Sequence, residues 1–178
     1  MPAGAACYEE KAAATTYYKD KTVDDKVKRE RFLHFSLQDA LPAGFVLVLD
    51  TRLGILSYLR FNEEGPQMLM QQQFTGNEVN MLMHLLESFP YYCPYEVLYA
   101  SFYNGEVTEA VVDRCRQHLQ IALEDGEWAK ETRQVRRAVS RIRLKLQTFG
   151  FNISSILETG YLLRVGAVRK GVEESVRR

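Results

Sequence analysis

The strongest hydrophobic pattern in the chain lies between residues 133 and 146. Four aliphatic residues recur there at the spacing of one helix face: Val135, Val139, Ile142 and Leu146. This spacing predicts an amphipathic helix with one buried stripe. The rest of its surface carries six cations and no acid: Arg133, Arg136, Arg137, Arg141, Arg143 and Lys145. Because neighbouring like charges repel, we expect this surface to face an anionic partner, the alternative being a solvated cationic face.

Residues 32–74 have a different pattern, in which short apolar runs alternate with turn-forming segments. The turns fall at residues 42–44, 50–54 and 62–66, which are rich in Gly, Pro, Asn and Asp. Short runs at roughly ten-residue spacing are typical of strands joined by tight turns. The pattern therefore predicts an antiparallel sheet of three or four strands.

Helical periodicity begins at Thr75, which forms a capping box with Glu78. A first helix is predicted from there to about Phe89, and a second from Pro94 to about Asn104. A third is predicted over residues 107–123, with one face formed by Val111, Cys115, Leu119 and Ala122. After the basic helix, two apolar runs flank a turn that contains Gly160, which predicts a C-terminal β-hairpin. These elements together predict an α+β fold.

Charge is distributed unevenly along the 178 residues, although the formal net charge is zero. Residues 126–178 hold 12 Lys and Arg against 5 Asp and Glu, whereas residues 1–125 hold 11 against 18. The balance is +7 in the C-terminal part and −7 in the remainder. A basic C-terminal third favours an anionic partner for that part of the molecule only.

The ends of the chain are polar and lack a strong period. We expect a flexible charged arm at residues 1–31 and a flexible tail at residues 166–178, flanking the sheet at 32–74 and a helical unit at 75–165. No apolar run resembles a signal peptide or a membrane span. Three cysteines without close spacing do not indicate a disulfide framework, so a reducing cytoplasmic location is expected.

Three motifs resemble those of OmpR/PhoB-type winged helix-turn-helix DNA-binding domains. Residues 74–79 (FTGNEV) resemble the L-T-x-x-E-F start of the first helix. Residues 135–146 resemble the recognition-helix pattern V-x-V-x-I-x-R-L-R-x-K-L, and residues 153–163 resemble the wing pattern I-x-T-V-x-G-x-G-Y-x-L. The match covers roughly residues 45–165, and the sheet, helix and hairpin order is also that of the family.

This resemblance implies a nucleoid-associated transcription regulator that binds double-stranded DNA sequence-specifically. The basic helix would lie in the major groove, with Arg141 at a base or phosphate and with Arg133 and Arg143 at the DNA backbone. The implied DNA-binding residues are Arg133, Arg136, Arg137, Ser140, Arg141, Arg143, Lys145 and Arg164. The family also makes a homodimer plausible, because many relatives bind DNA repeats.

Several positions depart from the family pattern. Leu157 stands where a minor-groove arginine is common, and Glu158 replaces the first wing glycine, so this wing should bind DNA poorly. Arg137 and Ala138 replace a common Val and His, so no base preference can be transferred. The N-terminal segment is too short for a receiver domain. An insertion at residues 104–131, with an extra helix and the single tryptophan, lies where the family often faces RNA polymerase.

A second hypothesis is that the chain is a winged-helix protein-interaction module that binds RNA polymerase or another regulator. The weak wing, the zero net charge and the insertion at 104–131 favour it. The aromatic cluster at residues 91–95 allows two interpretations. It could stack on nucleic-acid bases, or it could pack against the sheet or an interface, which its position before the second helix favours.

Catalytic and metal-binding motifs are not evident in the sequence. Cys115 and His118 have the spacing of half a zinc site, but no second pair accompanies them, so Cys115 is interpreted as a core residue. No phosphate-binding loop, dinucleotide fingerprint or nucleophile motif is present. We therefore expect neither an enzyme nor a cofactor.

Overall fold

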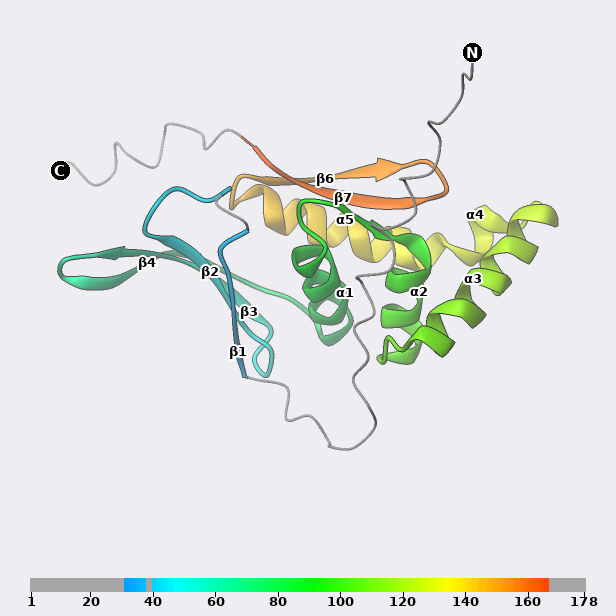
Figure 1. Cartoon of the computed structure of the whole chain (residues 1–178), viewed down its shortest axis with the longest axis horizontal. Helices are drawn as coiled ribbons and strands as arrows, with labels where there is room; N and C mark the ends of the chain where they lie inside the picture. Colours follow the sequence, from blue (N-terminus) through cyan, green and yellow to red (C-terminus); the bar gives the residue numbers. More distant parts are fainter. Residues whose placement is uncertain (1–30, 38–39, 167–178) are drawn as a thin grey trace, which may run out of the picture.

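Two antiparallel sheets and five helices form the part of the chain that the computed structural model describes, residues 31–37 and 40–166 (Figure 1). The predicted α+β class is confirmed. The larger sheet lies at one end of the long axis and helices α3 and α4 lie at the other. Nearly all of the predicted N-terminal arm and C-terminal tail lies outside the described residues.

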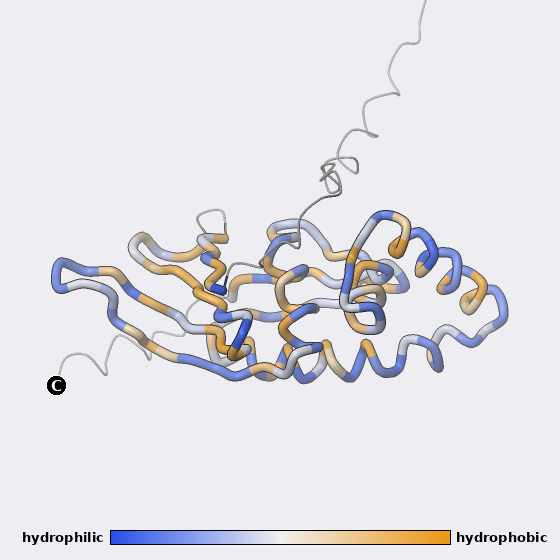
Figure 2. The backbone as a smooth tube through the Cα atoms, turned by 90° about the horizontal axis from the view of Figure 1, so that it is seen from below, coloured by the Kyte–Doolittle hydropathy of each residue, from blue (hydrophilic) through white to orange (hydrophobic). Residues whose placement is uncertain are grey.

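The larger sheet has the strand order β1-β2-β3-β4, with every neighbouring pair antiparallel. Its strands are β1 (Phe32–Phe35), β2 (Phe45–Asp50), β3 (Ile55–Asn62) and β4 (Gly65–Gln73). The sheet predicted for residues 32–74 is therefore confirmed, with four strands. In Figure 2 the β3–β4 hairpin extends to the far end of the molecule, where its turn is hydrophilic and its strands carry hydrophobic stretches.

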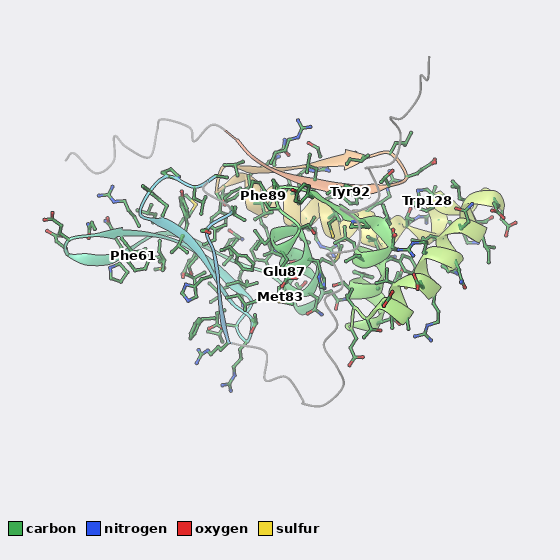
Figure 3. The ribbon with its side chains drawn as sticks, viewed as in Figure 1. Phe61, Met83, Glu87, Phe89, Tyr92 and Trp128 are labelled. Carbon is green, nitrogen blue, oxygen red and sulfur yellow. The ribbon has the colours of Figure 1, made fainter. Side chains whose placement is uncertain are left out.

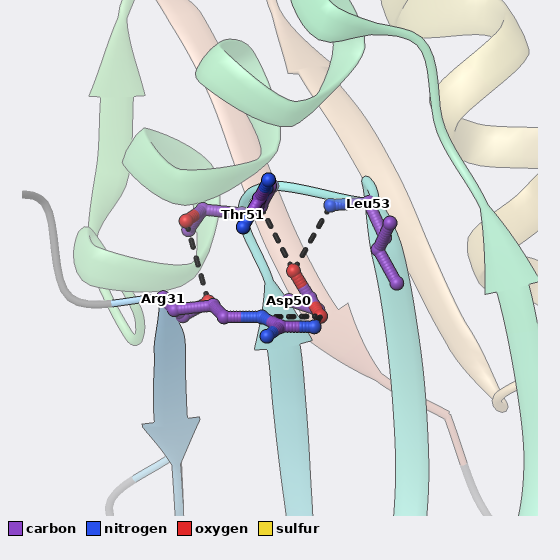
Figure 4. A network of polar contacts seen from close by, with 5 residues as sticks. Arg31, Asp50, Thr51 and Leu53 are labelled. Atoms are coloured by element: carbon purple, nitrogen blue, oxygen red, sulfur yellow. Dashed lines mark hydrogen bonds and ion pairs between the residues drawn. The ribbon is translucent and has the colours of Figure 1, made fainter.

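The β2–β3 turn is organised by the carboxylate of Asp50 (Figure 4). Its Oδ1 accepts hydrogen bonds from the backbone N–H groups of Arg52 and Leu53, both at 2.9 Å. Its Oδ2 accepts from the guanidinium of Arg31 at 3.2 Å. The Leu53 N–H bond is the main cause of a lowered Asp50 pKa, which the Arg52 and Arg31 bonds lower further against the opposing effect of burial. These bonds join the start of β1 to the end of β2.

The helices are α1 (Gly76–Glu87), α2 (Tyr95–Asn104), α3 (Glu109–Glu124), α4 (Trp128–Glu131) and α5 (Arg133–Gln147). Four of them correspond to predicted helices, and the one-turn α4 is additional. Pro94 is the N-cap of α2 rather than its first residue. The buried face of α3 includes Val112 instead of the predicted Val111, which is half-exposed.

The smaller sheet has the order β5-β7-β6. Strands β6 (Phe151–Ile156) and β7 (Gly160–Val165) form the predicted C-terminal hairpin, and β5 (Tyr92–Pro94) adds a third strand that was not predicted. Gly160 pairs with Pro94, and a Cβ at this position would overlap the Cys93 carbonyl oxygen. Gly160 therefore permits the close approach of β5.

The core joins these elements through the apolar stripe of α5. All four predicted stripe residues are buried, together with Ala138, at 1% exposure or less. They belong to one hydrophobic cluster with residues of α1, α2 and both sheets. Figure 1 shows α5 beside α1 and along the β6–β7 hairpin. Within the described residues, no helix is both long and apolar enough to cross a membrane.

Candidate nucleic-acid interface

Helix α5 is anchored at its N-terminus by aromatic residues. The Tyr95 hydroxyl of α2 donates to the backbone carbonyl of Thr132, the N-cap of α5, at 3.4 Å. The Tyr95 ring also packs against Trp128 of α4, with ring centroids 5.1 Å apart. Figure 3 shows Trp128 at the α4 end of the molecule. The single tryptophan of segment 104–131 therefore positions α5, in addition to any contact that it makes with a partner.

The cations of α5 fall into three groups around the helix. At about 100° per residue, Arg133 and Arg137 lie opposite the buried stripe, and both are exposed. Arg136 and Arg143 lie on the flank that faces the hairpin. Arg141 lies, with Lys145, on the opposite flank, toward α1.

The α1 flank of α5 is tied to Glu78, which is only 1% exposed. Glu78 Oε1 accepts from Arg141 Nε at 3.0 Å, and Oε2 accepts from Lys145 Nζ at 2.7 Å. Oε2 also accepts from the backbone N–H of Thr75 at 2.9 Å, the capping interaction predicted from sequence. Desolvation opposes ionisation of Glu78, but the bonds from Lys145, Thr75 and Arg141 outweigh it and lower its pKa. Two of the predicted DNA-binding cations thus have an internal partner.

The hairpin flank has a different arrangement. Arg143 Nε donates to the Ile153 carbonyl at 2.9 Å and so links α5 to β6. Ser140 is exposed, and its hydroxyl donates to the Arg136 carbonyl at 2.8 Å within the helix. Arg164 is exposed on β7, opposite Asn152. Among residues 31–37 and 40–166, no acidic side chain forms an ion pair with Arg133, Arg136 or Arg137.

A groove of about 310 Å³ separates α5 from the hairpin. Its polar lining includes Arg136, Ser140 and Arg143 of the helix and Ser155 of the hairpin. Leu157 and Glu158, at the tip of the hairpin, also line it. The guanidinium of Arg136, the terminal amino groups of Arg143 and the Ser155 hydroxyl can donate hydrogen bonds to an anion, which is the chemistry that binds a phosphate, whereas the Ser140 hydroxyl already donates within α5. Glu158, at the hairpin tip, opposes an anion on that side.

The tip of the β6–β7 hairpin carries an apolar and an acidic side chain. Leu157 is 86% exposed, so an apolar side chain occupies the outermost position of the turn. Glu158 has a φ of 53°, in the left-handed region that favours glycine. The Glu158 side chain places a negative charge at the tip.

Sequence reasoning overlooked Leu144. It lies opposite the buried stripe of α5, between the flanks that carry the cations, and it is 66% exposed. An exposed leucine on a basic helix surface is suited to an apolar contact such as a thymine methyl group. The sequence could have indicated this exposure, because Leu144 does not fall on the helical spacing of the buried apolar stripe.

Segment 104–131 packs on α2 through α3. Arg116 of α3 forms an ion pair with Glu96 of α2 at 3.0 Å, and His118 contacts Glu131 of α4 at 3.0 Å. A second groove, of about 420 Å³, opens between α2 and α3 beside Tyr99, Tyr103 and Arg114. These contacts attach the segment to the helical core and leave Ile121 58% exposed.

The other sequence-level candidates are part of the packing. Cys115 is buried, as interpreted from sequence, and accepts a 3.8 Å contact from Asn104 Nδ2, while burial raises its pKa. The described residues contain no cluster of three or more potential metal ligands. In the 91–95 cluster, Cys93 and Tyr95 are buried, whereas Tyr91 is 69% exposed.

Comparisons of the chain with protein-family models, with curated proteins and with solved structures found no match.

Proposed function

We propose that this protein is a winged helix-turn-helix transcription regulator that binds duplex DNA with α5 in the major groove. The observation that carries the proposal is the exposed, acid-free N-terminal half of α5. Arg133, Arg136 and Arg137 are exposed there, and Arg136 lines a groove whose donors suit a phosphate. The N-terminal end of a helix also attracts anions through its macrodipole, and the first turn of α5 holds no acid to neutralise it.

The arrangement of elements supports the winged-helix part of the proposal. Helices α1, α2 and α5 precede a hairpin that runs beside the last helix, and β5 secures that hairpin by pairing with β7. An α-helix is about 10–12 Å wide with its side chains, close to the width of the major groove at about 12 Å. The exposed side of α5 can enter the groove while its buried stripe stays in the core.

The three groups of cations then have different roles. Arg137 and Leu144, opposite the core, point toward base edges and supply sequence preference. Arg136 and Arg143, on the hairpin flank, face the phosphate backbone and supply salt-dependent affinity. Arg141 and Lys145 contribute less than the sequence motif implies, because Glu78 neutralises part of their charge.

Binding to duplexes selected from a random library tests this proposal, with fluorescence anisotropy at several salt concentrations. We expect Arg137→Ala to cost about 1–3 kcal/mol on the selected site and to relax its specificity. Arg136→Ala should weaken selected and random duplexes alike and reduce the salt slope by about 1. Arg114→Ala, an arginine on the exposed surface of α3, is the matched control. Selection of no motif, or equal binding by all four proteins, would contradict the proposal.

A second candidate function is binding of RNA polymerase or another protein through segment 104–131. The exposed Ile121 and the groove beside Tyr103 favour it. Pull-down with nuclease present separates the two functions. A partner that survives nuclease and is lost with Ile121→Glu, while DNA binding is unchanged, supports the second function. A partner that nuclease removes is bridged by DNA.

A further inference from the structure

The larger sheet has one face in the core and one apolar face outside it. Residues alternate between the faces, so Leu47 and Leu49 of β2 are fully buried, whereas their neighbours Val46 and Val48 are only half-buried. The cross-strand register places six apolar side chains on the same outer face: Val46, Val48, Ile55, Leu59, Phe61 and Met68. None of the six belongs to the hydrophobic cluster or packs against it.

This outer face is exposed as well as apolar. Phe61 is 51% exposed and Met68 is 56% exposed. Phe32 of β1, on the same face but at the opposite edge of the sheet, is 48% exposed. Figure 3 shows Phe61 on the β3–β4 hairpin, at the end of the molecule away from α3 and α4. Because monomeric proteins rarely expose contiguous apolar patches of this kind, the face has the character of an interface.

Charge is nearly absent from the outer face. Apart from His34, the only ionisable side chain that the register of the described strands places there is Asp50. Its carboxylate is bonded to Arg31 and to the backbone N–H groups of the β2–β3 turn (Figure 4). The Arg31 guanidinium also lies over the Phe32 ring, 4.8 Å from its centroid, so this corner of the face holds a neutralised ion pair. A face without net charge can pack against an identical face without strong repulsion, whereas recognition of a different protein normally uses charge complementarity.

The terminal segments of this chain are poor occupants for the face. In residues 1–30 the large aliphatic side chains are Met1, Val23 and Val27, against 12 charged residues. Residues 167–178 hold 6 charged residues among 12. Burial of such segments on an apolar sheet would desolvate charges without partners.

We propose that two copies of this protein associate through the outer faces of their larger sheets. Identical apolar faces without net charge suit a two-fold packing of sheet on sheet, about 10 Å apart. Four strands of about six residues give a flat area of about 400 Å² per copy, about half that of a standard interface. The dimer is therefore weak and concentration-dependent, and it leaves α5 free because the inner face of the sheet packs toward the helices.

Sedimentation equilibrium without DNA tests the proposal, so its result is independent of the proposed DNA binding. The wild-type mass should rise toward that of a dimer between low micromolar and submillimolar concentrations. The double variant Phe61→Glu/Met68→Glu should remain monomeric, because it places four acids in the paired faces. Ile121→Glu, which adds the same charge at a similarly exposed apolar residue on α3, should still dimerise.

Three results would overturn the proposal. The first is a wild-type protein that stays monomeric over the whole range, which would assign the face to a different partner. The second is a double variant that dimerises like the wild type, and the third is loss of the dimer in Ile121→Glu alone. If the double variant does not fold, NMR of the wild type replaces it: signals of Val48 and Leu59 must shift with concentration and those of α3 must not.

Discussion

Glu78 joins α1 to α5 through its side chain. It is buried on α1, yet it accepts hydrogen bonds from Arg141 and Lys145 across the core and from the N-terminal backbone of its own helix. A buried carboxylate with two cationic partners is costly to disturb, because removing one charge leaves the others without compensation. This residue links the start of α1 to the C-terminal half of α5.

We predict that Glu78→Gln lowers the free energy of unfolding by about 1.5–3 kcal/mol, the range for hydrogen bonds to charged groups. The amide retains the size of the side chain but cannot pair with two cations. Chemical denaturation measures the change. Glu87→Gln, at a carboxylate of the same helix that is 54% exposed, should change stability much less. Equal losses in both variants would contradict the role of the buried pairs.

The same carboxylate predicts a pH dependence. Its pKa is lower in the folded protein than the ordinary value of 4.5, so its contribution to stability is complete above about pH 4.5. That contribution is lost as the pH falls through the folded pKa. Unfolding free energies measured from neutral to acidic pH should therefore fall less steeply for Glu78→Gln than for the wild type. If the unfolding free energies of the two proteins fall equally steeply at acidic pH, other carboxylates cause the loss.

Gly160 predicts a second residue-level effect. Any Cβ there would overlap the Cys93 carbonyl and approach Pro94, so Gly160→Ala must separate β5 from β7. We expect a loss of more than about 2 kcal/mol in unfolding free energy, as for other overpacked sites. Gly105→Ala is an informative control, because its left-handed φ of 69° strains alanine but leaves the new Cβ in open space. A smaller loss for Gly160→Ala than for Gly105→Ala would contradict the steric argument.

At the scale of elements, the hairpin and α5 contribute unequally to the proposed DNA interface. The tip carries Leu157 and Glu158 and no cation, whereas the helix carries six. The affinity of the wild type should therefore come mainly from α5. A cation at the tip would restore the missing contact.

We predict that Leu157→Arg increases affinity for duplex DNA and steepens the dependence of log K on log salt by about 0.9, the value for one added phosphate contact. Anisotropy titrations at several salt concentrations measure both quantities. Leu157→Gln is the control, because it is polar without a charge. An unchanged salt slope for Leu157→Arg would show that the hairpin tip does not approach DNA.

At the scale of the whole molecule, the two proposed surfaces predict cooperative binding. The outer sheet face points away from α5, so a dimer can present two α5 helices to DNA. On a duplex with two half-sites about one helical turn of 10 base pairs apart, the wild type should bind more steeply than the Phe61→Glu/Met68→Glu variant. Both proteins should bind a single half-site equally. Equal steepness on both duplexes would show that the sheet face does not couple the half-sites.

The folded structure brings part of the acidic segment of the sequence into contact with the basic segment. Glu78 belongs to the acidic part of the chain, residues 1–125, yet it is bonded to two cations of the basic part. The basic helix is thus partly neutralised from within. Its positive charge without an acidic partner among the described residues lies in the N-terminal half and on the hairpin flank, which a count along the sequence does not reveal.

Local patterns determined most of the elements of this protein, with the exception of β5 and α4. The periods of Val135 to Leu146 and of the strands between residues 32 and 73, the Thr75–Glu78 cap and the turn at Gly160 located the others, because helix and strand periodicity reflects which side of each segment is buried. The predicted α5 stripe is buried in full. These elements involve residues close in sequence, whose geometry the backbone dictates.

Only the tertiary structure decided which cations remain available and which apolar faces remain open. Glu78 and Arg141 are 63 residues apart, and no local spacing indicates their contact. Likewise, the pairing of β5 with β7 and the exposure of Phe61 and Met68 depend on how the sheets pack. Alternation divides a strand into two faces, but packing against the helices selects the face that is buried. The basic helix recognised from sequence is therefore real, and its free surface is the part that the fold leaves unpaired.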